Sequence, residues 1–299
     1  MKVGLIGLGA MGSPMAHRVL AAGYPLFTTV HRNRAPADAL ATKGARIVDS
    51  AAEVAKAADV VLTILPADAE LEQTALGAGG LAEGFSPGKA LIEMTTCTAT
   101  TMQKVAKALA VAGVRVLDAP VSGGTTGAAE GKLTIMVGGD AKVLEEFQPL
   151  LKIMGTRIVH VGPVGQGKVV KIVNQAMAAT HLLAIGEAFA LGLRCGADPS
   201  TLYEVIKDSS GYSRMMDLRL PGFLLAGSFT PGFKLDLMKK DVNLALASAQ
   251  ELGVAVPLAS TVAKVFEAAS AAGLGNDDFA AAARFLAATL GADLGKGFP

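Results

Sequence analysis

The sequence has little net charge and few residues of the kinds that form disulfides or bind metals. Its 299 residues carry a formal net charge of +1, which gives no electrostatic reason to expect binding to nucleic acid or to an anionic membrane. The two cysteines, Cys97 and Cys195, fit neither a disulfide framework nor a metal-binding spacing. The four histidines are scattered as well, so we expect no metal site.

Long uninterrupted hydrophobic runs are also missing. The N-terminal "MKVGLIGLGAMG" is broken by glycines and lacks the apolar core and cleavage site of a signal peptide. The most apolar stretch, residues 177–195, contains His181, Glu187 and Arg194, so we interpret it as a core helix rather than a membrane span. With 51% hydrophobic and 18% charged residues, the chain can form a large core. We therefore expect a soluble, cytoplasmic protein with no membrane partner.

Short apolar runs alternate with helical stretches through the first half of the chain. This rhythm predicts βαβ units and a mainly parallel sheet that is covered by helices on both faces. After a Gly/Pro break near residue 163 we find no convincing strand, and the predicted helices are residues 166–193, 199–209, 234–252, 257–273 and 277–290. The predicted fold is α/β: an N-terminal Rossmann-like doubly wound sheet (residues 1–163), followed by an all-α C-terminal domain (residues 164–299) that begins with a long interdomain helix.

A glycine-rich motif follows the first predicted strand. The run Gly7-Leu8-Gly9-Ala10-Met11-Gly12 fits G-x-G-x-x-G and opens a helical segment. In this context the glycines allow a tight turn, a close approach of the backbone to a pyrophosphate and close packing of helix on strand. We therefore predict that Gly7, Gly9, Ala10, Met11 and Gly12 bind a dinucleotide, rather than forming only a tight turn.

The end of the second strand bears on the choice of cofactor. An NAD site usually has Asp or Glu about 20 residues after the glycines, where it holds the ribose hydroxyls. This chain has no carboxylate between Gly12 and Asp38, and the segment His31-Arg32-Asn33-Arg34 stands in that place. Because a guanidinium holds a phosphate in a bidentate manner, we favour NADP over NAD. Two solvated loop arginines are the alternative.

Three further segments follow predicted strands, at the edge where doubly wound sheets bind ligands. Leu65-Pro66 and Thr95-Thr96 offer amides and hydroxyls to the nicotinamide ribose, although ordinary turns would also use such residues. Ser122-Gly123-Gly124 offers a hydroxyl and unobstructed backbone N–H groups, which suit a small carboxylate. A plain glycine-rich turn between the strands 114–121 and 132–138 explains this last run equally well.

Lys171 stands among apolar residues in "GQGKVVKIVNQAM" (165–177). On a helix, Asn174 and Gln175 lie three and four positions further on and so share its face. Burial lowers the pKa of an ammonium towards neutrality, where it both gives and takes a proton, as the interconversion of alcohol and carbonyl requires. The alternative is a lysine whose ammonium reaches water or pairs locally at the helix start. For Lys171 taken by itself this alternative is favoured, and we interpret Lys168 in the same way.

Four motifs in order make the chain resemble a known family. They are "GLIGLGAMGSPMA", "DAPVSGGTTGAAEGKLTIMVGG", "GQGKVVKIVNQ" and "KKDVNLAL". Together they are similar to the β-hydroxyacid dehydrogenases, which include 3-hydroxyisobutyrate dehydrogenase, 2-hydroxy-3-oxopropionate (tartronate semialdehyde) reductase and related short-chain semialdehyde reductases. The resemblance runs through essentially the whole chain and does not single out one member.

The resemblance implies roles for the residues that match these motifs. Ser122, Gly123 and Gly124 match the family's substrate-carboxylate loop, and Lys171 matches its catalytic general acid/base. Asn174 matches the asparagine after this lysine, whereas Gln175 stands where several relatives rely on an asparagine, so either carboxamide is a candidate for contact with substrate.

Further roles follow from the same resemblance. Lys240 matches a lysine near the nicotinamide, braced by Asp241, and Thr96 matches a hydroxyl residue close to the nicotinamide ribose. The family also implies a homodimer or homotetramer, with much of the interface formed by the long helix that begins near residue 166.

The chain departs from one branch of the family. Many 3-hydroxyisobutyrate dehydrogenases have an acid after the second strand, and "VHRNR" lacks it. We therefore expect an NADPH-linked reductase that interconverts a small carboxylate-bearing aldehyde and the corresponding hydroxy acid. Candidate aldehydes are glyoxylate and the semialdehydes of succinate, tartronate and methylmalonate. Residues 209–222 are expected to line the substrate, with Arg214, Met215 and Arg219 available for a second carboxylate. A non-catalytic NADP-binding scaffold and an imine reductase remain as alternatives.

Overall fold

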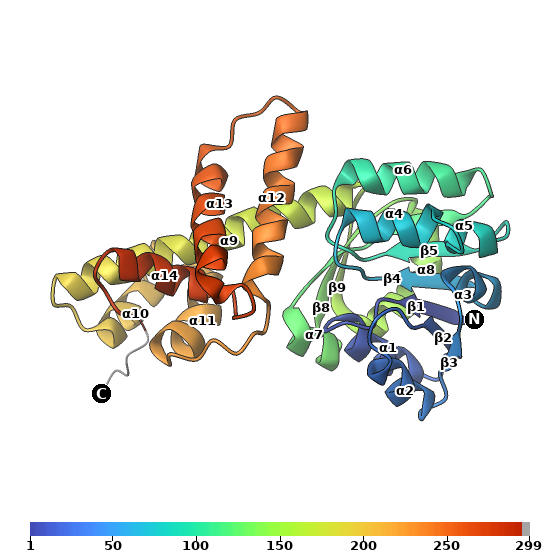
Figure 1. The fold of residues 1–299 in the computed structure, drawn as a ribbon, viewed down its shortest axis with the longest axis horizontal. Coiled ribbons are helices and arrows are strands. Elements are labelled where there is room, and N and C mark those ends of the chain that lie inside the picture. The colour runs from blue at the N-terminus through green and yellow to red at the C-terminus, as the bar shows by residue number, and fades with distance from the viewer. Residues whose placement is uncertain (295–299) are drawn as a thin grey trace. The chain divides into compact units, whose positions relative to one another are not determined.

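The computed structural model describes residues 1–294, which fall into two compact units (Figure 1). The first unit comprises Met1–Lys171 and the second begins at Ile172. The division lies inside the long helix α9 (Gln166–Arg194), eight residues after the boundary predicted at 163/164. The predicted fold class is confirmed: a Rossmann-like sheet domain comes first, then a helical domain that starts with a long helix.

One mixed sheet organises the first unit. Its parallel part has the order β3-β2-β1-β4-β5-β6, which is the order of a dinucleotide-binding sheet. Beyond β6 lies β8, antiparallel to it, and β8 pairs in turn with β7 and β9. The strands are β1 (Val3–Ile6), β2 (Leu26–Thr29), β3 (Arg46–Val48), β4 (Val60–Thr63), β5 (Ala90–Glu93), β6 (Arg115–Asp118), β7 (Val121–Ser122), β8 (Leu133–Gly138) and β9 (Gly155–Gly162).

Helices cover both faces of this sheet because its strands are apolar on both sides. Successive strand residues belong to different cores: Leu5 packs with helices α1, α2 and α8, whereas Ile6 packs with α3, α4, α5 and α6. The helices of the first unit are α1 (Gly12–Ala21), α2 (Ala35–Ala41), α3 (Ala51–Ala57), α4 (Asp68–Leu76), α5 (Leu81–Gly84), α6 (Ala99–Ala110), α7 (Gly124–Glu130) and α8 (Ala141–Met154).

Three elements of this unit escaped prediction. The strands β3 and β7 have only three and two residues, too short for a periodic pattern to register. The polar insertion after Ser122 forms the short helix α7 between β7 and β8, instead of a turn joining two strands. Its small residues, such as Gly127 and Ala128, are the buried ones, which hid its helical character.

The described part of the second unit consists of helices joined by loops and has no strand, apart from one isolated bridge between Lys234 and Asp278. Its core joins apolar residues of α9, α11, α12, α13 and α14, with Gly186 of α9 packed directly against Ala283. Residues 209–222, which were expected to line the substrate, include α11 and the start of η1. The elements are α9, α10 (Pro199–Lys207), α11 (Arg214–Arg219), η1 (Leu220–Leu225), α12 (Leu235–Glu251), α13 (Pro257–Ala269), η2 (Ser270–Leu274) and α14 (Ala281–Thr289).

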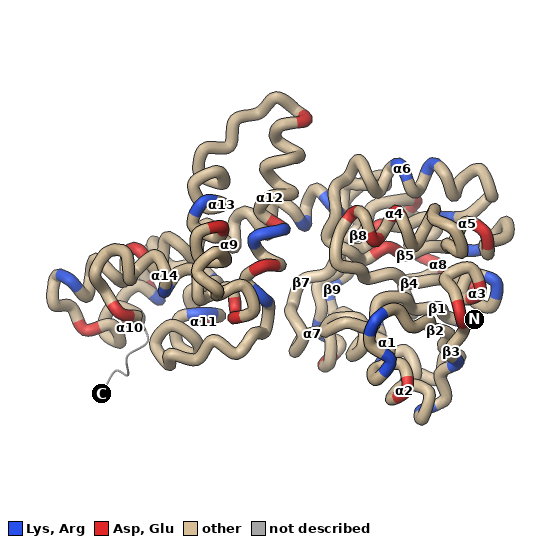
Figure 2. Tube along the Cα trace, viewed as in Figure 1, with Lys and Arg blue, Asp and Glu red and all other residues tan. Residues whose placement is uncertain are grey.

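Two surface properties of the chain bear on its partners. By length and composition alone, α9 is the only helix in residues 1–294 that is apolar enough to span a membrane, and 33% of that window is buried. A single helix of this kind is weak evidence of a span, because core helices of soluble proteins pass the same test. Basic and acidic residues are interspersed over both units without a long stretch of one sign, in keeping with the net charge of +1 (Figure 2).

Candidate active site

Most of the predicted site residues lie in the first unit, just after the carboxyl ends of its strands. Gly7 follows β1, Leu65 follows β4 and Thr96 follows β5, while Ser122 ends β7 shortly after β6. The strand order 3-2-1-4 in the sheet places the topological switch point between β1 and β4. In a sheet of this kind, the crevice at that point is where a dinucleotide binds.

The three glycines of the first loop have different surroundings. Gly7 has a φ of +102°, and a side chain there would collide with the carbonyl of Ile64. A side chain on Gly12 would collide with the carbonyl of Gly7, so this glycine lets α1 pack closely on the strand. A Cβ on Gly9 would meet nothing within 4 Å, which leaves its backbone open to a pyrophosphate.

The four residues predicted to meet the cofactor's ribose are all exposed, between β2 and α2. Asn33 accepts a hydrogen bond from the backbone N–H of Ala35 and so shapes the start of α2. The guanidinium of Arg34 lies 3.1 Å from the carboxylate of Asp38 one turn later. Arg32 is therefore the better placed of the two arginines to meet a phosphate.

The loops after β4 and β5 are tied to each other by side chains. The Thr95 hydroxyl accepts a hydrogen bond from the backbone N–H of Leu65 at 2.8 Å. Asp68 accepts from the N–H and the hydroxyl of Thr98, at 2.9 and 2.6 Å. Burial opposes ionisation of Asp68, but these hydrogen bonds hold its pKa below the ordinary value. The segment with Thr96 is thus fixed against Leu65-Pro66.

Ser122-Gly123-Gly124 joins β7 to α7. Both glycines have positive φ, +138° and +65°, a conformation that favours glycine. A Cβ on Gly124 would meet nothing within 4 Å, so its backbone faces open space. Ser122 is half-buried and pairs with Thr134 in β8, which fixes the start of this loop.

The two lysines of the motif at residues 165–177 differ in their surroundings. Lys171, in the second turn of α9, is buried, with 7% of its surface exposed. Lys168 has no exposed surface, and its ammonium forms an ion pair with Glu93 at the end of β5. The interpretation of Lys168 as a solvated or locally paired lysine is therefore wrong. Sequence reasoning missed Glu93, although an acid at the end of an apolar strand is an available signal.

The second unit holds the remaining predicted residues in one hydrogen-bonded chain. The carboxamide of Asn174 donates to the oxygen of Gln175 at 3.1 Å. Gln175 in turn donates to Asp241 at 2.7 Å, and the ammonium of Lys240 lies 2.9 Å from the other oxygen of Asp241. Gln175 and Asp241 are buried, at 6% and 2% exposure.

Arg219 does not serve as a free cation for substrate. Its guanidinium lies 3.1 Å from the buried carboxylate of Asp278 and stacks on the rings of Phe223 and Phe279. Burial lowers the pKa of Arg219, and Asp278 opposes that effect. Of the three residues considered for a second carboxylate, only Arg214 is an exposed cation.

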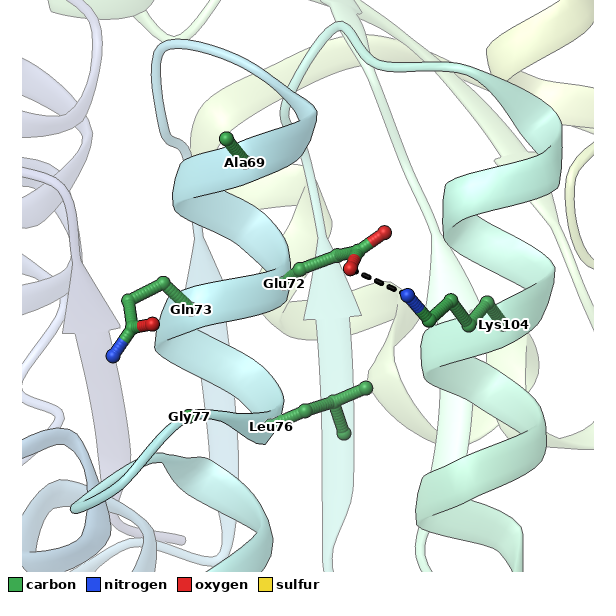
Figure 3. Close-up of a pocket in the computed structure, with 6 residues that line it drawn as sticks. All are labelled: Ala69, Glu72, Gln73, Leu76, Gly77 and Lys104. Atoms are coloured by element: carbon green, nitrogen blue, oxygen red, sulfur yellow. Dashed lines mark hydrogen bonds and ion pairs between the residues drawn. The ribbon is translucent and has the colours of Figure 1, made fainter.

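One open pocket of the first unit lies apart from all these residues, between α4 and α6 (Figure 3). It is lined by Ala69, Glu72, Gln73, Leu76, Gly77 and Lys104, with an exposed ion pair between Glu72 and Lys104. None of the predicted site residues contributes to it. In residues 1–294 no group of three or more His, Cys, Asp or Glu side chains is arranged to hold a metal.

Known proteins resemble this chain along its length. Residues 2–162 match the NAD binding domain of 6-phosphogluconate dehydrogenase, and residues 165–286 match a family described as NAD-binding of NADP-dependent 3-hydroxyisobutyrate dehydrogenase. The 2-(hydroxymethyl)glutarate dehydrogenase of Eubacterium barkeri is 39% identical and aligns over 94% of this chain and 93% of its own. The 2-hydroxy-3-oxopropionate reductase of Escherichia coli (strain K12) is 36% identical over 91% and 92%.

The chain belongs to the β-hydroxyacid dehydrogenase family. Membership makes it an NAD(P)-dependent oxidoreductase that acts on a CH–OH group. A crystal structure of 3-hydroxyisobutyrate dehydrogenase from Salmonella typhimurium has a TM-score of 0.83 and 32% identity, and covers 95% of this chain and 99% of its own. An imine reductase from Myxococcus stipitatus, with a TM-score of 0.64 and 21% identity, shares the fold alone.

Proposed function

We propose that this β-hydroxyacid dehydrogenase is an NADPH-linked reductase of small carboxylate-bearing semialdehydes, with Lys171 as its general acid/base. The observation that carries the proposal is the burial of Lys171 on the helix that begins at the carboxyl edge of the dinucleotide-binding sheet. Buried ammonium groups are uncommon in proteins, and those that occur are concentrated at functional sites. The family resemblance of the surrounding motif supplies the task.

The chemistry divides between the cofactor and the chain. A bound nicotinamide supplies or accepts the hydride at the carbon that carries the oxygen. Lys171 gives a proton to the carbonyl oxygen during reduction and takes it back during oxidation. Ser122 and the backbone N–H groups of Gly123 and Gly124 hold the substrate carboxylate. Glyoxylate and the semialdehydes of succinate, tartronate and methylmalonate all offer this carboxylate and carbonyl.

The hydrogen bonds of the second unit favour Asn174 over Gln175 as the carboxamide that meets substrate. Both ends of the Gln175 carboxamide are engaged, the nitrogen by Asp241 and the oxygen by Asn174. Asn174 is half-buried and uses its nitrogen in this chain, which orients its own oxygen. Gln175 and Asp241 then act as positioning residues, and Lys240 next to Asp241 is proposed to approach the nicotinamide.

The preference for NADP rests on Arg32. This side chain is exposed after β2, in a segment without a carboxylate, and Arg34 is engaged by Asp38. Arg32→Ala is expected to lower kcat/KM for NADPH about 10-fold or more and to leave kcat/KM for NADH nearly unchanged, because a guanidinium–phosphate contact contributes more than about 1.4 kcal/mol. Equal losses with both cofactors would contradict this assignment.

We also propose a homodimer or homotetramer that uses the exposed apolar face of α9. Val173 and Met177 on this helix are 53% and 54% exposed, and Leu258 at the start of α13 is 72% exposed. A groove between α9 and the start of α13 is lined in part by Met177, Pro257 and Leu258. A monomer at micromolar concentration, measured by sedimentation equilibrium, would contradict this proposal.

Lys171→Ala tests the central assignment. A general acid/base contributes about 10²- to 10⁴-fold to turnover, so kcat with NADPH and a responsive semialdehyde should fall by that factor. The dissociation constant for NADPH, measured by cofactor fluorescence, should stay within about threefold of the wild-type value. The matched control is Lys104→Ala on the surface of α6, which should change neither quantity. Retention of a tenth of the activity in Lys171→Ala would contradict the role.

A further inference from the structure

Three polar residues end neighbouring strands of the first unit in register. Thr63 of β4 lies beside Glu93 of β5, and Glu93 lies beside Asp118 of β6. All three have no exposed surface. The proposed reaction uses neither carboxylate. Charged groups buried in this way cost several kcal/mol each unless they are paired, so their presence calls for a purpose.

The ammonium of Lys168 compensates the carboxylate of Glu93. It forms an ion pair with one oxygen of this carboxylate and also donates to the backbone oxygens of Glu93 and Thr95, at 2.9 and 2.7 Å. An ammonium has three protons, and these three oxygens take all of them. Burial alone lowers the pKa of Lys168, but the carboxylates of Glu93 and Asp118 outweigh it and raise the pKa above its ordinary value.

Asp118 holds the backbone of the same helix turn. Its two carboxylate oxygens accept from the N–H groups of Gly165 and Lys168, at 2.7 and 3.0 Å. Gly167 packs so closely on this carboxylate that a side chain there would collide with it. The first turn of α9 is therefore fixed at two points. Asp118 at the end of β6 binds its backbone, and Glu93 at the end of β5 binds the side chain of Lys168.

These contacts lie next to the proposed acid/base Lys171 and the loop of Thr95 and Thr96. Lys171 follows Lys168 by three residues, about 4.5 Å further along the helix axis. Thr95, which accepts from Lys168, also holds the loop of Leu65 and precedes Thr96. One buried ammonium thus connects the helix of the proposed acid/base to the loop proposed to meet the nicotinamide ribose.

We infer that Glu93 and Lys168 are a positioning pair, which sets Lys171 against the loop of Thr95 and Thr96. The inference rests on the proposed role of Lys171. A buried ion pair is a poor source of stability, because apolar residues of similar volume often stabilise a protein as well or better. The benefit of this pair lies in geometry: a displacement of about 1 Å between reacting groups costs about 100-fold in rate.

The test compares two double variants of the same unit. Lys168→Met/Glu93→Gln removes both partners of the buried pair, so that neither is left alone, and Asp118 keeps its two backbone N–H donors. The single variant Lys168→Met serves as a second probe. The matched control, Lys104→Met/Glu72→Gln, removes the exposed pair between α6 and α4. For each protein, kcat and the dissociation constant for NADPH are measured. Labelling with acetic anhydride then gives the rate at Lys171 relative to the exposed Lys107, read by peptide mass spectrometry.

The labelling ratio decides the inference without relying on turnover. In the buried double variant, Lys171 should become accessible and its relative labelling should rise about 10-fold. The value of kcat should fall about 30-fold or more with NADPH binding within about threefold. An unchanged labelling ratio at Lys171, or an equal rise at the half-buried Lys89, would overturn the positioning role. If the wild type reduces no aldehyde, the proposed reaction fails, while the labelling ratio still decides whether the pair sets the position of Lys171.

Discussion

Each unit has an ion pair on a carboxylate with no exposed surface, Glu93–Lys168 in the first and Arg219–Asp278 in the second. The two pairs differ in construction, since Lys168 is fully buried and the Arg219 side chain is 16% exposed. Lys168 is a compact ammonium whose protons meet three oxygens at the end of one strand. Arg219 spreads a planar cation over the rings of Phe223 and Phe279, with centroids 4.7 and 4.5 Å away. The Lys168 ammonium holds the helix at one point of the strand end, whereas the Arg219 guanidinium packs against two aromatic rings as well as its carboxylate.

The anions of the two pairs differ as well. Glu93 holds the start of a helix that carries the proposed acid/base. Asp278 accepts hydrogen bonds from the backbone N–H groups of Gly232, Phe233 and Ala280. It thereby holds the loop between η1 and α12 against the start of α14. Loss of the first pair should therefore change turnover more than stability. Loss of the second should change stability and leave cofactor binding in the first unit intact.

Asp278→Ala should give the largest stability effect. Removal of one partner of a buried pair costs about 3–5 kcal/mol, because Arg219 and three N–H groups lose their acceptor. Urea unfolding followed by circular dichroism measures this loss, and NADPH fluorescence should show cofactor binding unchanged. A cost below about 1 kcal/mol would show that the loops hold without this carboxylate.

Arg219→Met should cost less, about 1–3 kcal/mol. Asp278 keeps its three N–H donors, so the loss is that of one charged partner and two ring contacts. Arg284→Met is the matched control, since this guanidinium stacks on the single ring of Phe229 at 4.6 Å. It should cost about 1 kcal/mol or less in the same unfolding experiment. Equal costs for the two variants would mean that Asp278 does not depend on its cation.

Asp68→Asn should make the first unit less sensitive to acid. Because the pKa of Asp68 is lower in the folded state, its stabilising contribution is present above the unfolded pKa of about 3.9 and is lost as the pH falls through the folded pKa. At pH 7 the variant should lose about 1–2 kcal/mol, since Thr98 donates to a charged acceptor. The difference in free energy of unfolding between the two proteins should stay constant from pH 7 to about 5 and shrink below about pH 4, and a difference that stays constant throughout would exclude this role.

The exposed pair Glu72–Lys104 should give the smallest effect. With side chains 37% and 59% exposed, it is solvated and screened, so Lys104→Met/Glu72→Gln should change the free energy of unfolding by less than about 1 kcal/mol. Added salt should reduce even this difference. If Lys104→Met/Glu72→Gln lowered the free energy of unfolding as much as Lys168→Met/Glu93→Gln does, the proposed difference between the exposed and the buried pair would be wrong.

The fold was predictable because its signals are local. Apolar runs, helical stretches and the glycines at 7, 9 and 12 form patterns that need only neighbouring residues, and the family motifs predict roles for Ser122 and Lys171. The buried pairs were not predictable in this way. Lys168 and Lys171 lie in the same apolar context, and the partner that distinguishes Lys168 is 75 residues away in sequence. Arg219 looked like a free cation until the fold placed Asp278 beside it.

The most direct test of the proposed reaction is the initial rate of NADPH and NADH oxidation by the wild-type enzyme with four aldehydes: glyoxylate and the semialdehydes of succinate, tartronate and methylmalonate. We predict rapid oxidation of NADPH with at least one of them, slower oxidation of NADH, and no significant rate in Lys171→Ala. A strong preference for NADH would contradict the role of Arg32. No reaction with any aldehyde, in a protein that binds both cofactors, would contradict the reductase itself.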